Sequence, residues 1–150
     1  MEKKTIDNNV NIYLKTTINQ ENDSEVFEFE TQGQLLVKNG AIFLRYTEII
    51  VGQNQTKVLI KLENTTMRIN RHGDSLTKMA FIAGKRMPAH YQTPAGQMQL
   101  ETYTTTLSSD INLTQLVGSA KVSYNLYANS AIVGQYDILL QFTEKSSKLN

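Results

Sequence analysis

The feature that most constrains the fold is the regular spacing of turn-forming residues along the chain. Glycine interrupts the sequence at eight positions, namely 33, 40, 52, 73, 84, 96, 118 and 134. The two widest intervals each contain a further turn candidate, Asn64-Thr65 and Ser108-Ser109-Asp110. Turns at intervals of roughly 8–12 residues, with β-branched and aromatic residues between them, are typical of an all-β sandwich or barrel.

Between these turns, apolar residues recur at every second position, as expected for strands that bury one face. The sets that share a face are Val10, Ile12, Leu14 and Ile18; Ile42, Leu44, Tyr46 and Ile50; Val58, Ile60 and Leu62; Met67 and Ile69; Ala120, Val122, Tyr124 and Leu126; and Tyr136, Ile138, Leu140 and Phe142. No window keeps a helical stripe over three turns, and residues 108–118 are the one segment where we expect a short helix.

The Asn-Gly dipeptide at residues 39–40 predicts the register of one hairpin. Both residues tolerate the positive φ angles that a two-residue type I′ turn requires. This turn places Val37 opposite Ile42 and Leu35 opposite Leu44. Each pair joins two apolar residues, so the turn chemistry and the alternation agree.

A second hairpin is predicted within the sequence HYQTPAGQMQL, residues 90–100. Pro94 presets φ for the second position of a type I turn, and Gly96 can adopt the positive φ that closes a three-residue loop. With this loop, His90 lies opposite Leu100 on an apolar face. A shift of one residue would move every side chain of the hairpin to the other face.

Composition and charge exclude several kinds of protein. The chain has no cysteine, so neither a disulfide framework nor a thiolate metal site is expected. Its formal net charge is +1 with the signs interspersed, so we predict no nucleic-acid partner. No apolar run approaches a membrane span and none follows the N-terminal lysines, so we expect a cytoplasmic protein without membrane contact. No phosphate-binding loop or dinucleotide fingerprint occurs, and no cofactor is expected.

Three polar side chains interrupt the apolar rows. Glu48 follows Tyr46, Arg71 follows Ile69, and His90 joins them if the second hairpin has the predicted register. One interpretation is that these side chains lie where their strands leave the core and are solvated. The alternative is an internal polar cluster in which Glu48 and Arg71 pair, because buried charges require partners.

The sequence RHGDS at residues 71–75 contains the residue types of a catalytic triad, but Gly-Asp-Ser is also favourable turn chemistry. We predict a turn. The two histidines, His72 and His90, are 18 residues apart and have no nearby ligand set, so no metal site is expected.

The order and spacing of several segments resemble the YwiB-like family of small bacterial proteins. The likeness extends from about Phe29 to Phe142 and is carried by IFLRYTE, INRHG, MAF, YQTPAGQMQLETYTT and GSAKVSYNLY. Its most specific parts are Arg-x-Gly at 71–73 and Tyr-x-Thr-Pro-x-Gly at 91–96, although the family often has an aromatic residue at the position of Ala95. The resemblance implies a calycin-like β-barrel and a domain of unknown function, with no established activity, cofactor or catalytic residue.

We therefore expect one all-β domain over residues 1–150, with residues 1–8 and 145–150 as flexible tails. The predicted fold is a single antiparallel up-and-down β-barrel, calycin- or lipocalin-like, with about eight to ten strands. The interior of a small barrel either is filled by side chains or holds one small ligand.

The leading functional hypothesis is a non-enzymatic barrel that binds a small, largely apolar or anionic molecule. Ligand pockets combine apolar walls with a few polar groups, and the expected inward rows contain both. The candidate ligand-binding residues are Tyr46, Glu48, Arg71, His90, Thr102, Thr104 and Tyr124. Arg71 is the expected anchor, because a guanidinium can bind a carboxylate or phosphate through two hydrogen bonds.

Two alternatives stay open. One is a protein–protein interaction module without a pocket, which acts through apolar residues near Leu36 and Phe43 or through sheet pairing in a homodimer. The other is an acid–base enzyme in which Glu48 and His90 face one cavity. The expected partners are thus a small-molecule ligand or a second copy of the chain.

Overall fold

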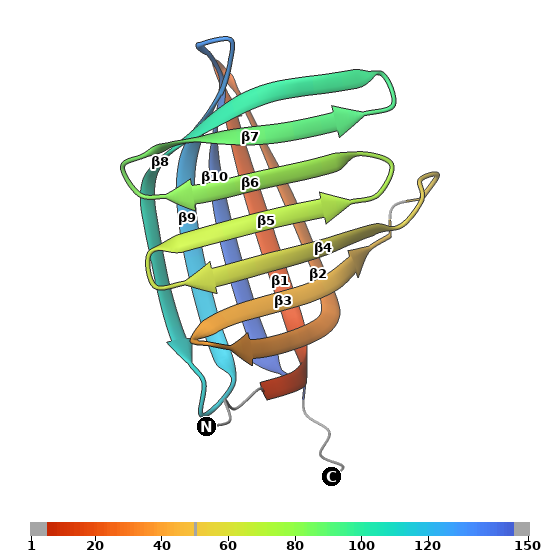
Figure 1. Cartoon of the computed structure of the whole chain (residues 1–150), viewed down its shortest axis with the longest axis vertical. Coiled ribbons are helices and arrows are strands. Elements are labelled where there is room, and N and C mark those ends of the chain that lie inside the picture. Colours follow the sequence, from red (N-terminus) through yellow and green to blue (C-terminus); the bar gives the residue numbers. More distant parts are fainter. Residues whose placement is uncertain (1–5, 50, 146–150) are drawn as a thin grey trace.

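The computed structural model describes residues 6–49 and 51–145, and these residues form one closed antiparallel β-barrel (Figure 1). The described residues contain ten strands: β1 (Ile6–Gln20), β2 (Asp23–Lys38), β3 (Ala41–Glu48), β4 (Thr56–Glu63), β5 (Thr66–His72), β6 (Leu76–Ile82), β7 (Arg86–Thr93), β8 (Gly96–Asn112), β9 (Val117–Ala128) and β10 (Ala131–Glu144). Each strand pairs with its neighbours in sequence, and β1 pairs with β10 to close the barrel. The predicted all-β, up-and-down barrel is confirmed.

The predicted tails fall mostly outside the described part of the chain. Residues 6–8 belong to β1 and pair with β2, and the backbone N–H of Lys145 donates a hydrogen bond to the carbonyl of Asn9 at 3.0 Å. Residues 1–5 and 146–150 lie outside the described residues. Among residues 6–49 and 51–145, no helix is long and apolar enough to cross a membrane.

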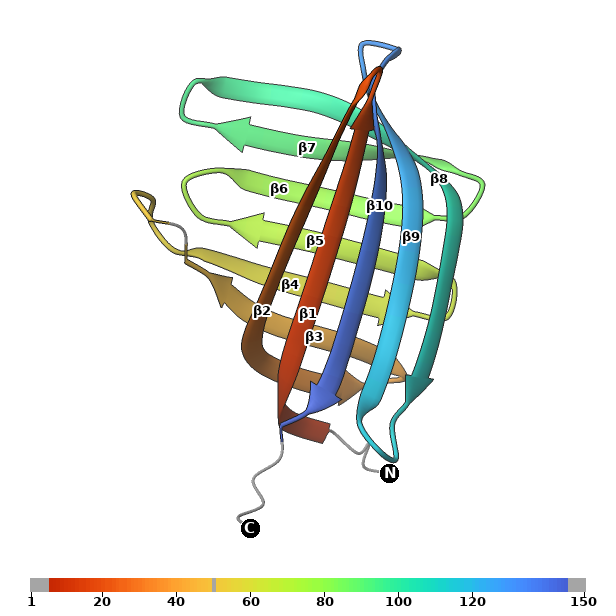
Figure 2. The same cartoon turned by 180° about the vertical axis from the view of Figure 1, so that it is seen from behind.

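The barrel has two layers, and the long strands β2 and β8 pair with strands of both. β1, β9 and β10 run steeply in one layer, and β3 to β7 cross them in the other (Figures 1 and 2). β2 pairs with β1 along nearly its whole length but with β3 only through Gln34–Lys38. β8 pairs with β7 through Gly96–Tyr103 and with β9 from Leu100 onward. A bulge between Thr104 and Thr106 accompanies the passage of β8 between the layers.

The hairpin predicted from the Asn-Gly dipeptide at residues 39–40 is confirmed. The two residues have φ angles of 56° and 80°, as a type I′ turn requires. Val37 lies opposite Ile42 and Leu35 lies opposite Leu44. All four side chains are buried, so this hairpin carries part of the core.

The loop length predicted for the second hairpin is wrong. The loop contains only residues 94–95, and Thr93 pairs with Gly96. Thr93 explains the tighter turn, because its hydroxyl accepts a hydrogen bond from the Ala95 N–H at 3.1 Å and donates one to the Gly96 carbonyl at 3.2 Å. The positive φ predicted for Gly96 is confirmed at 142°.

The shorter loop shifts the register of β7 against β8 by one residue. His90 lies opposite Gln99 rather than Leu100, and its side chain is exposed. Tyr91 takes the position on the inward row, opposite Met98. The prediction that His90 points into the barrel is therefore wrong.

The prediction of a short helix at residues 108–118 is also wrong. β8 continues to Asn112 and β9 begins at Val117, so the chain reverses direction through residues 113–116. The side-chain carbonyl of Asn112 accepts a hydrogen bond from the Gln115 N–H at 3.0 Å. This local side-chain hydrogen bond stabilises a turn where the sequence pattern was ambiguous.

Side chains fill the space between the two layers. Buried apolar residues from both layers form one continuous cluster. Its least exposed members include Phe81, Phe142, Leu35, Leu44, Ile60 and Leu140. The interior is therefore packed, as in a small barrel whose side chains occupy the lumen.

Candidate functional site

The barrel is closed, but β2 and β3 separate on one side, beyond the residues through which they pair. A groove of about 760 Å³ lies there. It is lined by residues 26–31 of β2, residues 47–49 at the end of β3, Leu14 and Thr16 of β1, and Arg71 of β5. We call it the mouth groove. Of the predicted ligand-binding residues, Glu48 and Arg71 line it.

Gly33 lies at the point where β2 leaves β3. A Cβ atom at this position would clash with the backbone carbonyl oxygen of Arg45 and would lie 3.0 Å from the Cβ of Tyr46. Glycine is therefore needed for the close approach of the two strands. Beyond it, residues 23–32 of β2 continue along β1 without a partner in β3.

Glu48 and Arg71 form an ion pair across the mouth groove. Arg71 Nη1 donates a hydrogen bond to Glu48 Oε1. The side chain of Glu48 is 11% exposed and that of Arg71 is 30% exposed. The predicted pairing is thus present, but it lies where the strands leave the core, so each of the two interpretations holds in part.

Tyr46 is buried near this pair. Its ring centroid lies 5.7 Å from that of Phe29, and its hydroxyl has no hydrogen-bond partner among the described residues. Burial raises the pKa of the Tyr46 hydroxyl well above its usual value, while Arg71 lowers it and Glu48 raises it to a smaller extent. Tyr46 therefore packs beside Phe29, which lines the groove, and its buried hydroxyl keeps its proton.

Tyr124 lies in the core rather than in the mouth groove. Its ring centroid is 4.6 Å from that of Phe81 and 5.0 Å from that of Tyr136, with which it stacks. Burial raises the pKa of its hydroxyl. The side chain contributes to packing between the layers.

Thr102 and Thr104 are fully buried on β8, where they complete the barrel wall. β6 pairs with β7 only through residues 76–78, and beyond this point the Thr102 hydroxyl donates a hydrogen bond to the Ala80 carbonyl at 3.0 Å. The Thr104 carbonyl accepts one from the Gly84 N–H at 2.7 Å. Neither threonine lines the mouth groove.

The acid–base pair considered from the sequence is not assembled. His90 is exposed on β7 opposite Gln99, whereas Glu48 is bound to Arg71. The described part of the chain also contains no group of three or more His, Cys, Asp or Glu residues that could hold a metal ion.

Of the segment predicted as a turn at 71–75, the first two residues belong to β5, and residues 73–75 join β5 to β6. Its Asp74 carboxylate accepts a hydrogen bond from Asn54 Nδ2 at 2.7 Å. This contact links the turn to the loop between β3 and β4. Asp74 therefore has a structural role beside the mouth groove.

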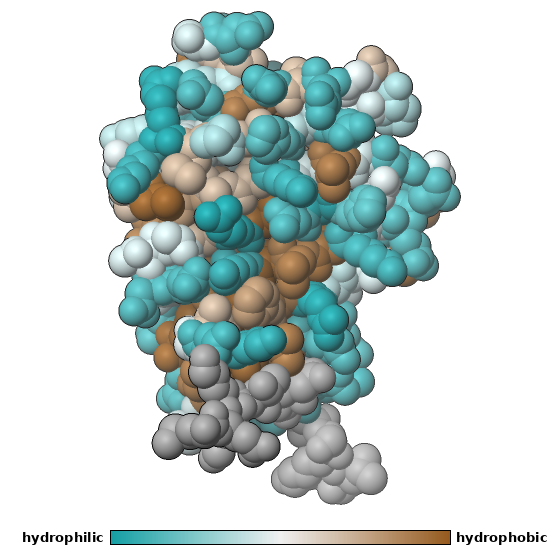
Figure 3. Space-filling model, in the orientation of Figure 1, coloured by the Kyte–Doolittle hydropathy of each residue, from teal (hydrophilic) through white to brown (hydrophobic). Residues whose placement is uncertain are grey.

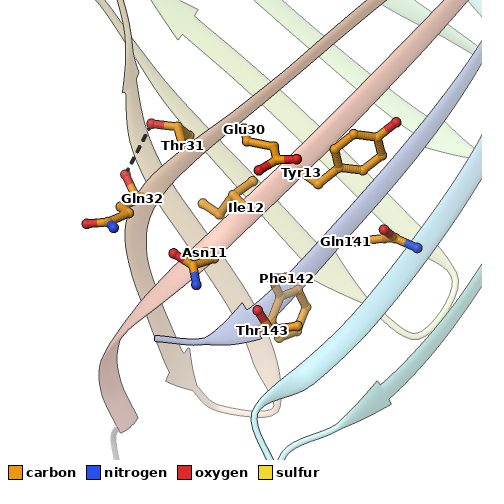
Figure 4. Close-up of a pocket in the computed structure, with 9 residues that line it drawn as sticks. All are labelled: Asn11, Ile12, Tyr13, Glu30, Thr31, Gln32, Gln141, Phe142 and Thr143. Atoms are coloured by element: carbon orange, nitrogen blue, oxygen red, sulfur yellow. Dashed lines mark hydrogen bonds between the residues drawn. The ribbon is translucent and has the colours of Figure 1, made fainter. Parts of the chain in front are cut away.

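A second hollow, of about 710 Å³, lies on the outer face of β1, β2 and β10 (Figure 4). Polar side chains such as Asn11, Tyr13 and Gln141 line it. The Tyr13 hydroxyl donates a hydrogen bond to Glu28, which raises the pKa of that hydroxyl. None of the predicted ligand-binding residues lies in this hollow.

The outer face near Leu36 and Phe43 is not a broad apolar surface. Both residues are half-buried, and the Lys61 ammonium lies 5.6 Å from the centroid of the Phe43 ring. Figure 3 shows hydrophobic and hydrophilic residues interspersed over the face formed by β3 to β7. The interaction hypothesis for this face stays a prediction.

The sequence reasoning missed the apolar lining of the mouth groove, above all Phe27, Phe29 and Ile49. A signal was present in the predicted hairpin. Continuing its register would place Glu48, the end of β3, opposite Thr31. The preceding residues of β2 therefore extend beyond β3 and cannot be covered by it.

The chain is similar to known proteins over most of its length. The model of a family described as "Domain of unknown function (DUF1934)" matches residues 12–140. The "Uncharacterized beta-barrel protein YwiB" of Bacillus subtilis (strain 168) is 25% identical over 118 residues, which are 79% of this chain and 81% of that protein. The crystal structure of ywiB protein from Bacillus subtilis matches with a TM-score of 0.83 at 21% identity, over 93% of this chain and 94% of that one. This structural match supports the fold alone.

Proposed function

The chain belongs to the family described as Domain of unknown function (DUF1934), and from this premise we propose that it is a non-enzymatic protein that binds a small, largely apolar ligand in the mouth groove. The observation that carries the proposal is the groove itself. Its volume of about 760 Å³ falls within the range of ligand sites, and apolar walls there meet the polar groups of Glu48 and Arg71. A cytoplasmic location, expected from the sequence, stays part of the proposal.

The charges around the mouth groove favour a neutral or cationic ligand over an anionic one. The Arg71 guanidinium is already bound to Glu48. Glu28 and Glu30 also belong to the lining, with their side chains on the outer face of β2 at the rim of the groove. An anion would have to compete with Glu48 for Arg71 and would be repelled by the remaining carboxylates. Of the two ligand types expected from the sequence, we therefore propose the largely apolar one and not the anionic one.

The position of the groove explains how a packed barrel could still bind a ligand. Phe27 and Ile49 lie at the opening and are 53% and 75% exposed. Exposed apolar side chains on both walls of a hollow would lose contact with water when a ligand enters. The ligand would lie against the core and not within it.

A titration with N-phenyl-1-naphthylamine, a neutral probe whose fluorescence rises in apolar sites, tests this proposal. We expect saturable binding with one site per chain. Phe27→Ser and Ile49→Ser should each raise the dissociation constant about tenfold, because each removes much of an apolar contact.

The matched control is Ile132→Ser, at an apolar residue that is 54% exposed and lies outside the mouth groove. This variant should leave the dissociation constant unchanged. Absence of saturable binding, or equal loss of affinity in Ile49→Ser and Ile132→Ser, would contradict the proposal.

A further inference from the structure

The N-terminal half of β2 is a strand with one free edge. Asp23–Gly33 pair with β1 on one side, whereas β3 pairs only with Gln34–Lys38. Within the described residues, no backbone hydrogen bond reaches this segment from the other side. Figure 2 shows the same half of β2 as the outer strand of its layer. In an antiparallel strand, every second residue directs its N–H and C=O groups toward each edge, so this edge presents unpaired donors and acceptors.

The mouth groove follows this free edge. Its lining includes six consecutive residues of β2, 26–31. The opposite wall comes from residues 47–49 at the end of β3 and from Arg71 of β5. The groove therefore lies between the unpaired part of β2 and the end of β3, along the free edge. The six residues extend over roughly 20 Å, the length of a typical strand.

The two faces of this edge have different chemistry. Phe27 and Phe29 lie on the inner face, opposite Thr16 and Leu14 of β1. Glu28 and Glu30 lie on the outer face, and neither forms an ion pair within the described part of the chain. An added strand would thus place one row of side chains beside aromatic rings and the other row beside carboxylates.

Self-pairing through this edge is unfavourable. In an antiparallel pair formed by two copies, the acidic residues of one β2 would face those of the other. Asp23 and Glu25 add further negative charge at the same edge. Like charges on directly opposed strands are destabilising, and charge on an edge strand is a common means of preventing such association.

We propose that an extended polypeptide segment, in which apolar residues alternate with Lys or Arg, adds as a strand to the free edge of β2. This inference rests on the proposed function, because it takes the mouth groove as a binding site, and it adds a peptide as a second class of ligand for that site. The backbone of the segment pairs with residues 26–31, its apolar side chains contact Phe27 and Phe29, and its cationic side chains lie beside Glu28 and Glu30. Main-chain hydrogen bonds of this kind supply affinity, and the alternating side chains supply specificity.

Capped eight-residue peptides that alternate Lys with Val or Phe test the inference with the full-length chain. The readout is displacement of N-phenyl-1-naphthylamine, together with amide hydrogen exchange of residues 23–33. We expect displacement and slower exchange at alternate amides of β2. A peptide with Glu in place of each Lys should bind at least about tenfold more weakly.

Two comparisons separate strand addition from simple apolar binding. N-methylation of the peptide at one set of alternate residues should abolish binding, while N-methylation at the other set should not, because the alternation of side chains fixes which amides face β2. The double variant with Glu28→Lys and Glu30→Lys should reverse the preference in favour of the Glu peptide.

Four other outcomes would overturn the inference, and they distinguish its failure from the failure of the small-molecule proposal. If the probe binds but the peptides do not displace it, the small-molecule proposal stands and strand addition fails. Equal binding of both N-methylated peptides excludes backbone pairing. If the probe does not bind and a peptide binds without slowing exchange in β2, both proposals fail. A dimer in sedimentation that Glu28→Lys alters would identify a second copy as the occupant.

Discussion

The guanidinium of Arg71, at the end of β5, binds the carboxylate of Glu48, at the end of β3, and this ion pair forms part of the wall of the mouth groove. Both side chains follow apolar residues on inward rows. The pair fixes the ends of two strands where the barrel wall opens. It also neutralises the one cation in the lining of the groove.

Replacing one partner of this pair should cost more than the interaction itself contributes. We expect Arg71→Met to lower the free energy of unfolding by about 2 kcal/mol, because it leaves a mostly buried carboxylate unpaired. Glu48→Gln should cost about 1 kcal/mol, since Arg71 is better solvated. Urea unfolding of both single variants and the double variant measures the coupling. Strict additivity of the two single effects would contradict the pairing.

Gly33→Ala tests the close approach of β2 and β3. The added methyl group would clash with the backbone carbonyl of Arg45, which cannot move aside as a flexible side chain could. We expect a loss of roughly 2 kcal/mol or more in unfolding free energy. A fully stable variant would mean that the strands do not approach closely at this position.

Gly96→Val tests a different restriction, because a side chain there would meet no atom within 4 Å. The φ angle of 142° alone disfavours a β-branched residue. We expect a loss of about 1 kcal/mol or more, measured by thermal unfolding. An unchanged midpoint would argue against a positive φ at this turn.

Thr102 and Thr104 provide a matched pair of buried hydroxyl groups on one strand. The Thr102 hydroxyl donates to the Ala80 carbonyl, whereas the Thr104 hydroxyl has no hydrogen-bond partner among the described residues. Thr102→Val should therefore destabilise the fold by about 1 kcal/mol, and Thr104→Val should be neutral or stabilising. Chemical denaturation of both variants under one set of conditions measures the contrast. Equal effects would disprove the assigned partner.

Stability should decrease at alkaline pH because of two buried tyrosines. Burial raises the pKa of Tyr46 and Tyr124 above the ordinary value of 10.0, so the folded chain retains protons that the unfolded chain releases. Their contribution is complete below about pH 10 and declines as the pH rises beyond it, by at most about 1.4 kcal/mol per pH unit for each group. Unfolding free energies measured between pH 8 and about pH 11 check this. Tyr46→Phe should make the decline shallower, and an unchanged slope would contradict burial of its hydroxyl.

Local patterns were sufficient to predict an all-β fold of short antiparallel strands, and the family resemblance favoured a barrel over a sandwich. The alternation in segments such as Val58–Leu62 identifies the buried face of each strand, and the Asn-Gly dipeptide at 39–40 determines a register without knowledge of the rest of the chain. Where local chemistry allowed two answers, prediction failed. Pro94 and Gly96 are compatible with a three-residue loop, but hydrogen bonds of Thr93 favour a two-residue loop, and this difference of one residue reverses the side of His90.

The candidate site was harder to predict because it depends on where strands diverge. Arg71 and Glu48 were identified because each breaks an apolar row, which is a local signal. Phe27 and Phe29 also follow an ordinary alternating pattern, and nothing local distinguishes them from core residues. Their exposure at the groove follows from the departure of β2 from β3 near Gly33, which is a property of two strands and their relative lengths.

Mapping the binding site of N-phenyl-1-naphthylamine by backbone amide chemical shifts tests the central claim most directly. The account predicts that the largest shift changes fall on residues 26–31 and 47–49 and saturate with the fluorescence titration. Largest changes on the outer hollow around Asn11 and Gln141, or on the hairpin that contains Ile132, would contradict the assignment of the mouth groove as the binding site.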